Sequence, residues 1–216
     1  MSYFGIHCKK VRQNEIVIFK CRESEIKPFI NNEIVIVSID PGTINYAIRI
    51  ESIKKEKIEM LVYKKRNLPK EENLKMYALN QFLDEFKEYY KRIHYVLIEK
   101  QMVFNHKANR IGHHTVSYFI NICKNLPNYP RVIEFDSKLK TRVLSDEKIP
   151  GKKTKKWSIE FCKNELEKRN DLISLEILKK SRKKDDLADV VSQICSFLKI
   201  MNINQENLNT WIEPDF

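Results

Sequence analysis

The sequence predicts an α/β protein with a mixed central sheet that is covered by helices on both faces. Two short runs of consecutive apolar, mostly β-branched residues, 34–40 and 95–99, are typical of strands buried on both sides. Residues 44–50 alternate between apolar and polar, and residues 58–63 follow closely enough to pair with them as a hairpin. Segments with apolar residues at helical spacing surround these strands, which favours helices packed on both sides of the sheet.

The chain has 216 residues, which suffice for one domain with a sizeable core. Residues 1–32 are set apart as an N-terminal arm of unknown role that includes a strand-like run at 16–19, and residues 33–216 form the predicted domain. Pro41-Gly42 ends the first buried strand in a turn. The predicted helices span about 71–92, 108–125, 157–168 and 186–200, and a third short inner strand lies at 131–135.

The charge of the chain indicates the class of its partner. The formal net charge is +11 and the pI about 9.3, which favours nucleic acid first and an anionic membrane surface second. No apolar run approaches the roughly 20 residues of a spanning helix, so we expect no membrane insertion. The five cysteines are odd in number and scattered, and the first ten residues lack signal-peptide features. We therefore expect free thiols in an intracellular, reducing compartment, and neither a disulfide framework nor a zinc site.

Acidic residues stand where three buried elements begin or end. Asp40 closes the first buried strand and Glu99 the second, so the two side chains project from one edge of the sheet if these strands are neighbours. Asp185, Asp186 and Asp189 open the last helix, where residues three apart share a face. Converging carboxylates repel one another unless cations neutralise them, and such oxygen ligands suit Mg²⁺ or Mn²⁺. The set predicts a two-metal site for phosphodiester hydrolysis.

Each of these positions also has a purely structural explanation. An Asp before Pro-Gly is common in turns, and a Glu after an apolar strand commonly marks a solvated strand end. Acids in the first turn of a helix act as caps and as partners of the helix dipole. The combination of all three in this order, on a basic chain, favours the metal site.

Three stretches resemble the motifs of RuvC-type Holliday-junction resolvases: SIDPGTINYA at 38–47, LIEKQ at 97–101 and KKDDLAD at 183–189. The likeness is greatest to the resolvases of poxviruses and other large DNA viruses, and the fungal mitochondrial resolvases are also similar. It covers about residues 34–198, whereas the first thirty or so residues have no counterpart in it.

The resemblance implies an RNase H-like fold and a homodimer that makes paired symmetric nicks in four-way or branched DNA. It also implies two Mg²⁺ ions per active site, for which Mn²⁺ can substitute, held by Asp40, Glu99, Asp186 and Asp189. Spacing alone leaves Asp185 as an alternative to Asp186, because Asp185 and Asp189 also share a helix face. If the origin is viral, as the likeness implies, the site of action would be the host-cell cytoplasm.

Two lysines resemble positions at which RuvC-like enzymes carry catalytic lysines. Lys140 follows the third inner strand and Lys156 stands at the start of the next helix. A lysine at either place can stabilise the charge that develops on the phosphorane. Lys138, Lys153 and Lys155 are near enough in sequence to be confused with them.

Basic residues are concentrated beside the last of these acids. Residues 138–184 hold sixteen Lys and Arg against seven Asp and Glu. A solvated charged face is the simple explanation, but the position of the run favours contact with a DNA backbone. Residues 102–104 resemble the apolar wedge at the junction crossover, with a core aromatic as the alternative for Phe104. The residues expected to contact DNA are Phe104, Lys138, Lys152, Lys153, Lys155, Arg182, Lys183 and Lys184.

Three other functions share some of these features. Actin-like and sugar-kinase ATPases open with a similar strand-Asp-x-Gly-Thr motif, but they need a second glycine-rich loop, and this chain has four glycines and no Gly-Gly pair. Another RNase H-like nuclease, acting on RNA–DNA hybrids or in strand transfer, would use the same carboxylates. A non-catalytic DNA-binding protein of this fold is the third alternative, which the intact acidic set disfavours.

Overall fold

The computed structural model describes residues 11–12, 15–19, 32–127 and 130–205. Within them a single mixed sheet of six strands has the order β1-β6-β5-β2-β3-β4. β2, β5 and β6 run parallel to one another, whereas β1, β3 and β4 are antiparallel to their neighbours. The strands are β1 (Ile16–Phe19), β2 (Glu33–Pro41), β3 (Asn45–Lys54), β4 (Ile58–Asn67), β5 (Tyr95–Lys100) and β6 (Arg131–Asp136).

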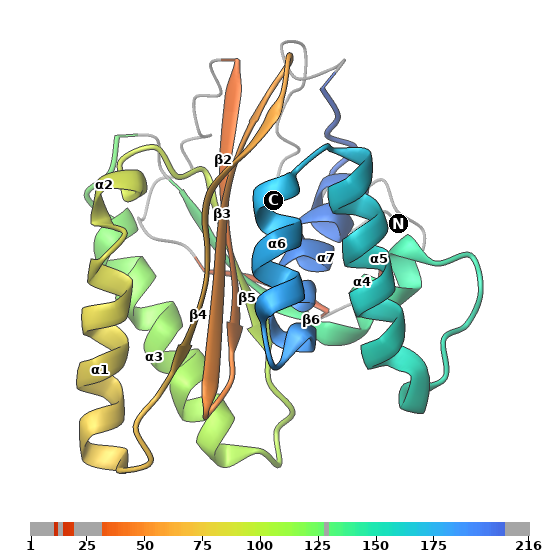
Figure 1. The fold of residues 1–216 in the computed structure, drawn as a ribbon. Coiled ribbons are helices and arrows are strands. Elements are labelled where there is room, and N and C mark those ends of the chain that lie inside the picture. The colour runs from red at the N-terminus through yellow and green to blue at the C-terminus, as the bar shows by residue number, and fades with distance from the viewer. Residues whose placement is uncertain (1–10, 13–14, 20–31, 128–129, 206–216) are drawn as a thin grey trace.

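The central strands are buried because helices cover the sheet on both sides (Figure 1). α1, α2 and α3 pack on one face, and α4 to α7 pack on the other. The helices are α1 (Glu72–Asp84), α2 (Lys87–Tyr90), α3 (His106–Cys123), α4 (Ser137–Leu144), α5 (Thr154–Lys168), α6 (Leu172–Lys180) and α7 (Lys184–Ile200), with a 3₁₀ turn at Gly151–Lys153. The predicted α/β class with helices on both faces is confirmed.

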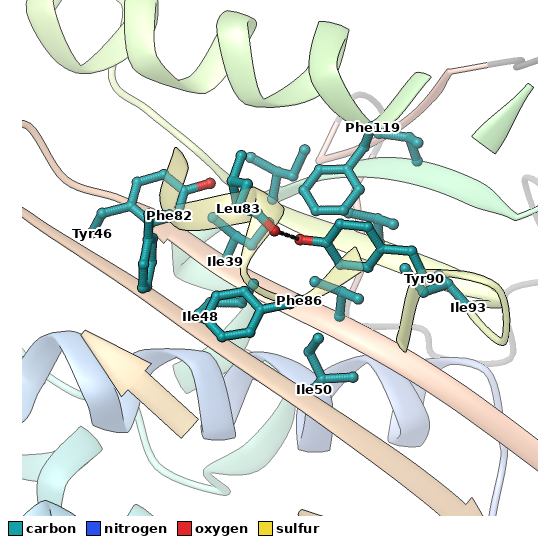
Figure 2. Packing of buried hydrophobic residues seen from close by; sticks show 14 of the residues in the cluster. Ile39, Tyr46, Ile48, Ile50, Phe82, Leu83, Phe86, Tyr90, Ile93 and Phe119 are labelled. Atoms are coloured by element: carbon teal, nitrogen blue, oxygen red, sulfur yellow. Dashed lines mark hydrogen bonds between the residues drawn. The ribbon is translucent and has the colours of Figure 1, made fainter. Parts of the chain in front are cut away.

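Aromatic rings from α1, α2 and the turn between them make up much of the core on the first face (Figure 2). Phe82 and Phe86 meet edge to face with their ring centres 5.2 Å apart, over Ile48 of β3. The Tyr90 hydroxyl is buried and donates a hydrogen bond to the carbonyl of Leu83 at 2.8 Å, so its polar end has a partner. This face of the sheet is covered by packed apolar side chains. The acidic side chains at the strand ends lie on the opposite face.

The structure differs from the predicted elements in three places. The helix expected over 71–92 is divided at residues 85–86, where the amide of Phe86 bonds the carbonyl of Leu83 in a tighter three-residue turn. α4 and α6 were not predicted. Both begin with an aspartate side chain that caps the first turn: Asp136 accepts from the amide of Lys138, and Asp171 from the amide of Ser174.

The strand-like run at 16–19 forms the edge strand β1, and it pairs antiparallel with β6 from Ile16 opposite Phe135 to Phe19 opposite Val132. Glu15 precedes it, and its carboxylate accepts hydrogen bonds from both terminal nitrogens of Arg142 on α4, at 2.7 and 2.6 Å. β1 therefore covers the edge that β6 would otherwise expose. No described helix combines the length and the apolar character needed to cross a membrane.

Candidate active site

Asp40 and Glu99 lie side by side at the carboxyl edge of the sheet. β2 and β5 are parallel neighbours, and Ile39 pairs with Ile98, so the next residue of each strand projects from the same edge. Asp40 is also paired with Ala47 of β3, whose side chain lies in the cluster packed under α7. Because directly opposed residues share a face, the Asp40 carboxylate faces α7.

α7 supplies the other carboxylates. Its apolar residues Leu187, Ala188 and Val191 pack on the sheet, which leaves Asp186 and Asp189 near the sheet's acidic edge. The buried Ser158 of α5 donates a hydrogen bond to Asp189 Oδ1 at 2.7 Å. The sequence therefore predicted correctly that both strands end near the beginning of the last helix.

A lysine ammonium lies among these carboxylates. Lys140 of α4 is only 5% exposed, and its Nζ donates to Glu99 and lies 3.2 Å from Asp189 Oδ1. Its positive charge also acts on Asp40. Lys140 is thus the cation on which carboxylates from a strand and from a helix converge.

The electrostatics of the group follow from burial and from like charges. Burial raises the pKa of Asp40 well above its ordinary value, and the negative charges of Glu99 and Asp189 raise it further against the opposing charge of Lys140. Burial also raises the pKa of Glu99, although Lys140 works in the opposite direction. Burial disfavours the charged form of Lys140, but Asp189 and Glu99 outweigh it and raise its pKa, so the ammonium stays protonated.

Asp185 and Asp186 are adjacent in sequence but differ in their surroundings. Asp185 accepts a hydrogen bond from the exposed Lys155 at 2.7 Å, and although burial opposes it, this contact lowers the pKa of Asp185. Asp186 Oδ2 is buried and has no hydrogen-bond partner, and burial together with the charge of Asp185 raises its pKa. A buried carboxylate oxygen without a hydrogen-bond partner costs free energy. A ligand bound to this oxygen would supply the missing partner.

The described residues contain no ready-made metal site, since no three His, Cys, Asp or Glu side chains among them are grouped as ligands of one ion. Lys140 occupies the middle of the group instead. The donor chemistry nevertheless suits a hard cation, because all the candidate ligands are carboxylates and Asp186 has an unpartnered buried oxygen. Among described residues, the Asp40 carboxylate likewise makes no hydrogen bond.

The turn after Asp40 requires a glycine. A Cβ atom built on Gly42 would lie 2.1 Å from the carbonyl oxygen of Asn45, far inside contact distance. The amide of Gly42 bonds the carbonyl of Asp40 at 3.0 Å, so the chain folds back tightly into β3. This close approach explains the Pro41-Gly42 signal in the sequence.

The residues expected to contact DNA are solvent-accessible. Phe104 is 77% exposed, next to the apolar and likewise exposed Met102 (58%) and Val103 (82%), so the alternative of a core aromatic does not hold. Lys156 is exposed on α5 and pairs with no described side chain, whereas Ser158 on the same helix reaches Asp189. Lys138, Lys152, Lys153, Lys155, Arg182 and Lys183 are exposed, and Lys184 is partly exposed.

Three residues near the site escaped the sequence analysis. Ser158 contacts Asp189, and Tyr63 and Lys65 of β4 contact the start of α7. The alternation of β4 places Tyr63 and Lys65 on one face, which is a signal in the sequence. Nothing in their spacing to α7 identifies the partner, however, because more than a hundred residues separate them.

Two solved structures share this fold, one of a viral resolvase and one of a yeast resolvase. The fowlpox virus resolvase in complex with Holliday junction DNA superimposes with a TM-score of 0.56 at 20% identity, over 77% of this chain and 97% of that chain. The yeast mitochondrial Holliday junction resolvase gives a TM-score of 0.55 at 14% identity, over 88% and 87% of the two chains. This chain therefore shares its fold with Holliday junction resolvases, which confirms the predicted fold.

Two proteins of invertebrate iridescent viruses are related in sequence. The uncharacterised protein 97L of invertebrate iridescent virus 3 is 30% identical over 153 residues, which cover 68% of this chain and 70% of that protein. The uncharacterised protein 170L of invertebrate iridescent virus 6 is 30% identical over 141 residues, 56% of each protein. No protein-family model matches the sequence. The chain belongs to the same family as protein 97L of invertebrate iridescent virus 3.

Proposed function

We propose that this protein is a Holliday-junction resolvase, a structure-specific endonuclease that hydrolyses phosphodiester bonds in four-way or branched DNA. The observation that carries the proposal is the convergence of Glu99 and Asp189 on the buried Lys140, with Asp40 beside them at the carboxyl edge of the sheet. The same fold in the junction-bound fowlpox virus resolvase supports the choice of substrate. The net charge of +11 fits a polyanionic partner.

Mg²⁺ is the cofactor that we propose, two ions per active site, with Mn²⁺ as a substitute. Asp40, Glu99, Asp186 and Asp189 would hold the ions, and the unpartnered oxygen of Asp186 supports its choice over Asp185, which is engaged by Lys155. When bound, such ions activate a water molecule and stabilise the leaving oxygen.

The chain's own residues contribute charge and orientation. The Lys140 ammonium stays protonated, so it can stabilise the negative charge that develops on the scissile phosphate. Ser158 fixes one oxygen of Asp189 by its hydrogen bond and thereby orients the other. Lys156 is exposed on α5, on a different helix face from Ser158, and we propose that it contacts a phosphate once DNA is bound.

The DNA backbone would lie along the basic residues around the start of α7. Lys152 and Lys153 lie in the 3₁₀ turn just before α5, and Lys155 lies in its first turn. Lys155 contacts Asp185 of α7, so this cluster and residues 182–184 are close to each other. Phosphate contacts of this kind supply affinity without reading sequence. Lys138 extends the basic surface onto α4.

Phe104 would contact the branch point. The strand β5 that carries Glu99 ends just before the exposed residues 102–104, so this apolar tip lies on the side of the sheet where the strands end. Aromatic side chains bind unpaired bases by stacking, whatever their sequence. A four-way junction has two equivalent strands to cut, which favours a symmetric homodimer with one active site for each.

The first experiment is to incubate the purified protein with an immobile four-way junction, a linear duplex and an RNA–DNA hybrid, in Mg²⁺ or in EDTA. We expect metal-dependent, symmetric nicks in two opposing strands of the junction, read on a denaturing gel. Preferential cutting of the hybrid would assign another RNase H-like nuclease, and binding without cutting would assign a non-catalytic DNA-binding protein.

Variants test the assignment of residues. Asp40→Asn and Glu99→Gln should reduce cutting to the level of the EDTA control while junction binding persists, because the basic surface is intact. Cutting at the wild-type rate would contradict the assignment. Lys156→Ala should slow cleavage more than it weakens binding, with Lys168→Ala on the exposed far end of α5 as the control for charge. Equal losses would make Lys156 a simple phosphate contact.

A further inference from the structure

Two side chains of β4 reach across to the beginning of α7. The Tyr63 hydroxyl donates a hydrogen bond to the carbonyl of Leu187 at 3.0 Å. The Lys65 ammonium donates to the carbonyl of Lys183 at 2.9 Å and to the hydroxyl of Ser181 at 3.1 Å. The Ser181 hydroxyl in turn donates to the same carbonyl of Lys183 at 3.0 Å. β4 therefore contacts α7 just before its first residue and within its first turn.

These contacts add to the one that Lys155 makes with Asp185 in the first turn of the helix. Lys183 is the residue that precedes α7, and it provides no side-chain cap for the helix. Backbone carbonyls accept both contacts from β4, so these contacts attach the main chain at the start of the helix to the sheet. Asp186 lies between the two points that β4 holds, and Asp189 follows one turn later.

The sheet register places Lys65 in line with Asp40. Asp40 is paired with Ala47, and Ala47 is paired with Lys65, so the three residues form one row across β2, β3 and β4 and share one face. Neighbouring strands are about 4.8 Å apart, which puts the backbones of Lys65 and Asp40 about 10 Å apart. The small side chain of Ala47 lies between them, in the cluster with Leu187 and Ala188.

We propose that Lys65 and Tyr63 are positioning residues. They fix where α7 begins along the direction of the strands, so that Asp186 and Asp189 lie next to Asp40 and Glu99. The inference rests on the proposed function, because it gives these contacts a role in assembling the metal ligands. Lys65 is only partly exposed and its ammonium is bound to two oxygens of the chain, which distinguishes it from the exposed lysines of the basic surface.

The test compares Lys65→Met and Lys65→Arg with the control Lys64→Met. Lys64 is the neighbouring residue of β4, its side chain is 58% exposed and it pairs with Glu85, so its removal changes the charge equally. Three quantities are measured: Mn²⁺ affinity by calorimetry, hydrogen exchange of the amides of residues 184–190 without metal, and junction affinity in EDTA as a function of salt.

We expect Lys65→Met to weaken Mn²⁺ binding by about ten- to a hundredfold, as loss of a residue that orients metal ligands typically does. The amides at the start of α7 should exchange faster, because that turn opens more readily. Junction affinity in EDTA and its salt dependence should remain at the wild-type values. Lys65→Arg, which keeps a cationic donor, should recover most of the Mn²⁺ affinity, and Lys64→Met should match the wild type.

Wild-type Mn²⁺ affinity and exchange in Lys65→Met would overturn the proposal. If the salt dependence of junction binding fell by about one unit at the same time, Lys65 would be a phosphate contact. If the wild-type protein itself bound no Mn²⁺, the metal centre of the proposed function would fail. The exchange rates of residues 184–190 would then decide separately whether Lys65 holds α7, and unchanged rates would overturn the inference.

Discussion

Below helices α5 to α7 the sheet carries two groups of buried charged side chains, one at its carboxyl edge and one farther along β3. The second group centres on Glu51, which accepts from Arg49 at 2.5 Å and from Arg169, just after α5, at 3.1 Å. Arg49 also donates to Asp171 and Ser174 at the start of α6, each at 2.9 Å. Arg49, Glu51 and Ala47 alternate along β3, so both groups lie on the same face.

The two groups differ in how fully their charges are paired. Burial opposes the ionisation of Glu51, but the charges of Arg49 and Arg169 outweigh it and lower its pKa. At the acidic edge burial prevails, and the pKa values of Asp40 and Glu99 are raised. Matched opposite charges join β3, α5 and α6, whereas an excess of carboxylates around one lysine leaves room for a cationic ligand. The comparison teaches that the first kind of group joins elements of the fold, whereas the second costs free energy, which the proposed metal binding would explain.

The largest effect is expected when the paired group is broken. Glu51→Gln leaves Arg49 and Arg169 buried without their common partner, and we expect the free energy of unfolding to fall by about 3–5 kcal/mol. Urea denaturation measures this loss. The exposed Glu147→Gln removes the same charge and should change stability by less than about 0.5 kcal/mol. A comparably small effect at Glu51 would mean that the Glu51 group does not stabilise the fold, and the contrast with the acidic edge would fail.

A second prediction uses pH to sharpen the comparison. Because the pKa of Glu51 is lower in the folded state, its ionisation stabilises the protein above the ordinary glutamate pKa, and this contribution is lost as the pH falls through the folded-state value. Stability should decline by up to about 1.4 kcal/mol per pH unit for this one proton. Denaturation between pH 6 and pH 3, compared with Glu51→Gln, isolates the contribution, and parallel curves for the two proteins would contradict it.

The smallest expected effect has the opposite sign. Asp40→Asn removes a buried charge that repels Glu99 and Asp189, so in EDTA the variant should be more stable than the wild type by about 1 kcal/mol. Added Mg²⁺ should raise the melting temperature of the wild type more than that of the variant, because the variant has lost a ligand. A variant that is less stable in EDTA would show that Asp40 serves the fold in the way that Glu51 does.

Local sequence patterns determined the central strands and the last helix of the molecule. The apolar, mostly β-branched runs at 34–40 and 95–99 predicted strands buried on both sides, because consecutive apolar residues need cover on both faces. That alone placed Asp40 and Glu99 at strand ends, and the apolar spacing of the last helix placed Asp186 and Asp189 near its start. The order of these elements, with the basic stretch beside them, predicted the fold and its acidic edge.

Only the tertiary structure decided how the side chains at that edge are paired. Sequence spacing allowed Asp185 as readily as Asp186, and the two became distinct because Lys155, thirty residues earlier, contacts only Asp185. The contacts of Lys140 with Glu99 and of Lys65 with Lys183 likewise join residues that are 41 and 118 positions apart. Local sequence sets the conformation of each element, but a contact between distant elements depends on how the whole chain packs, and no local spacing encodes it.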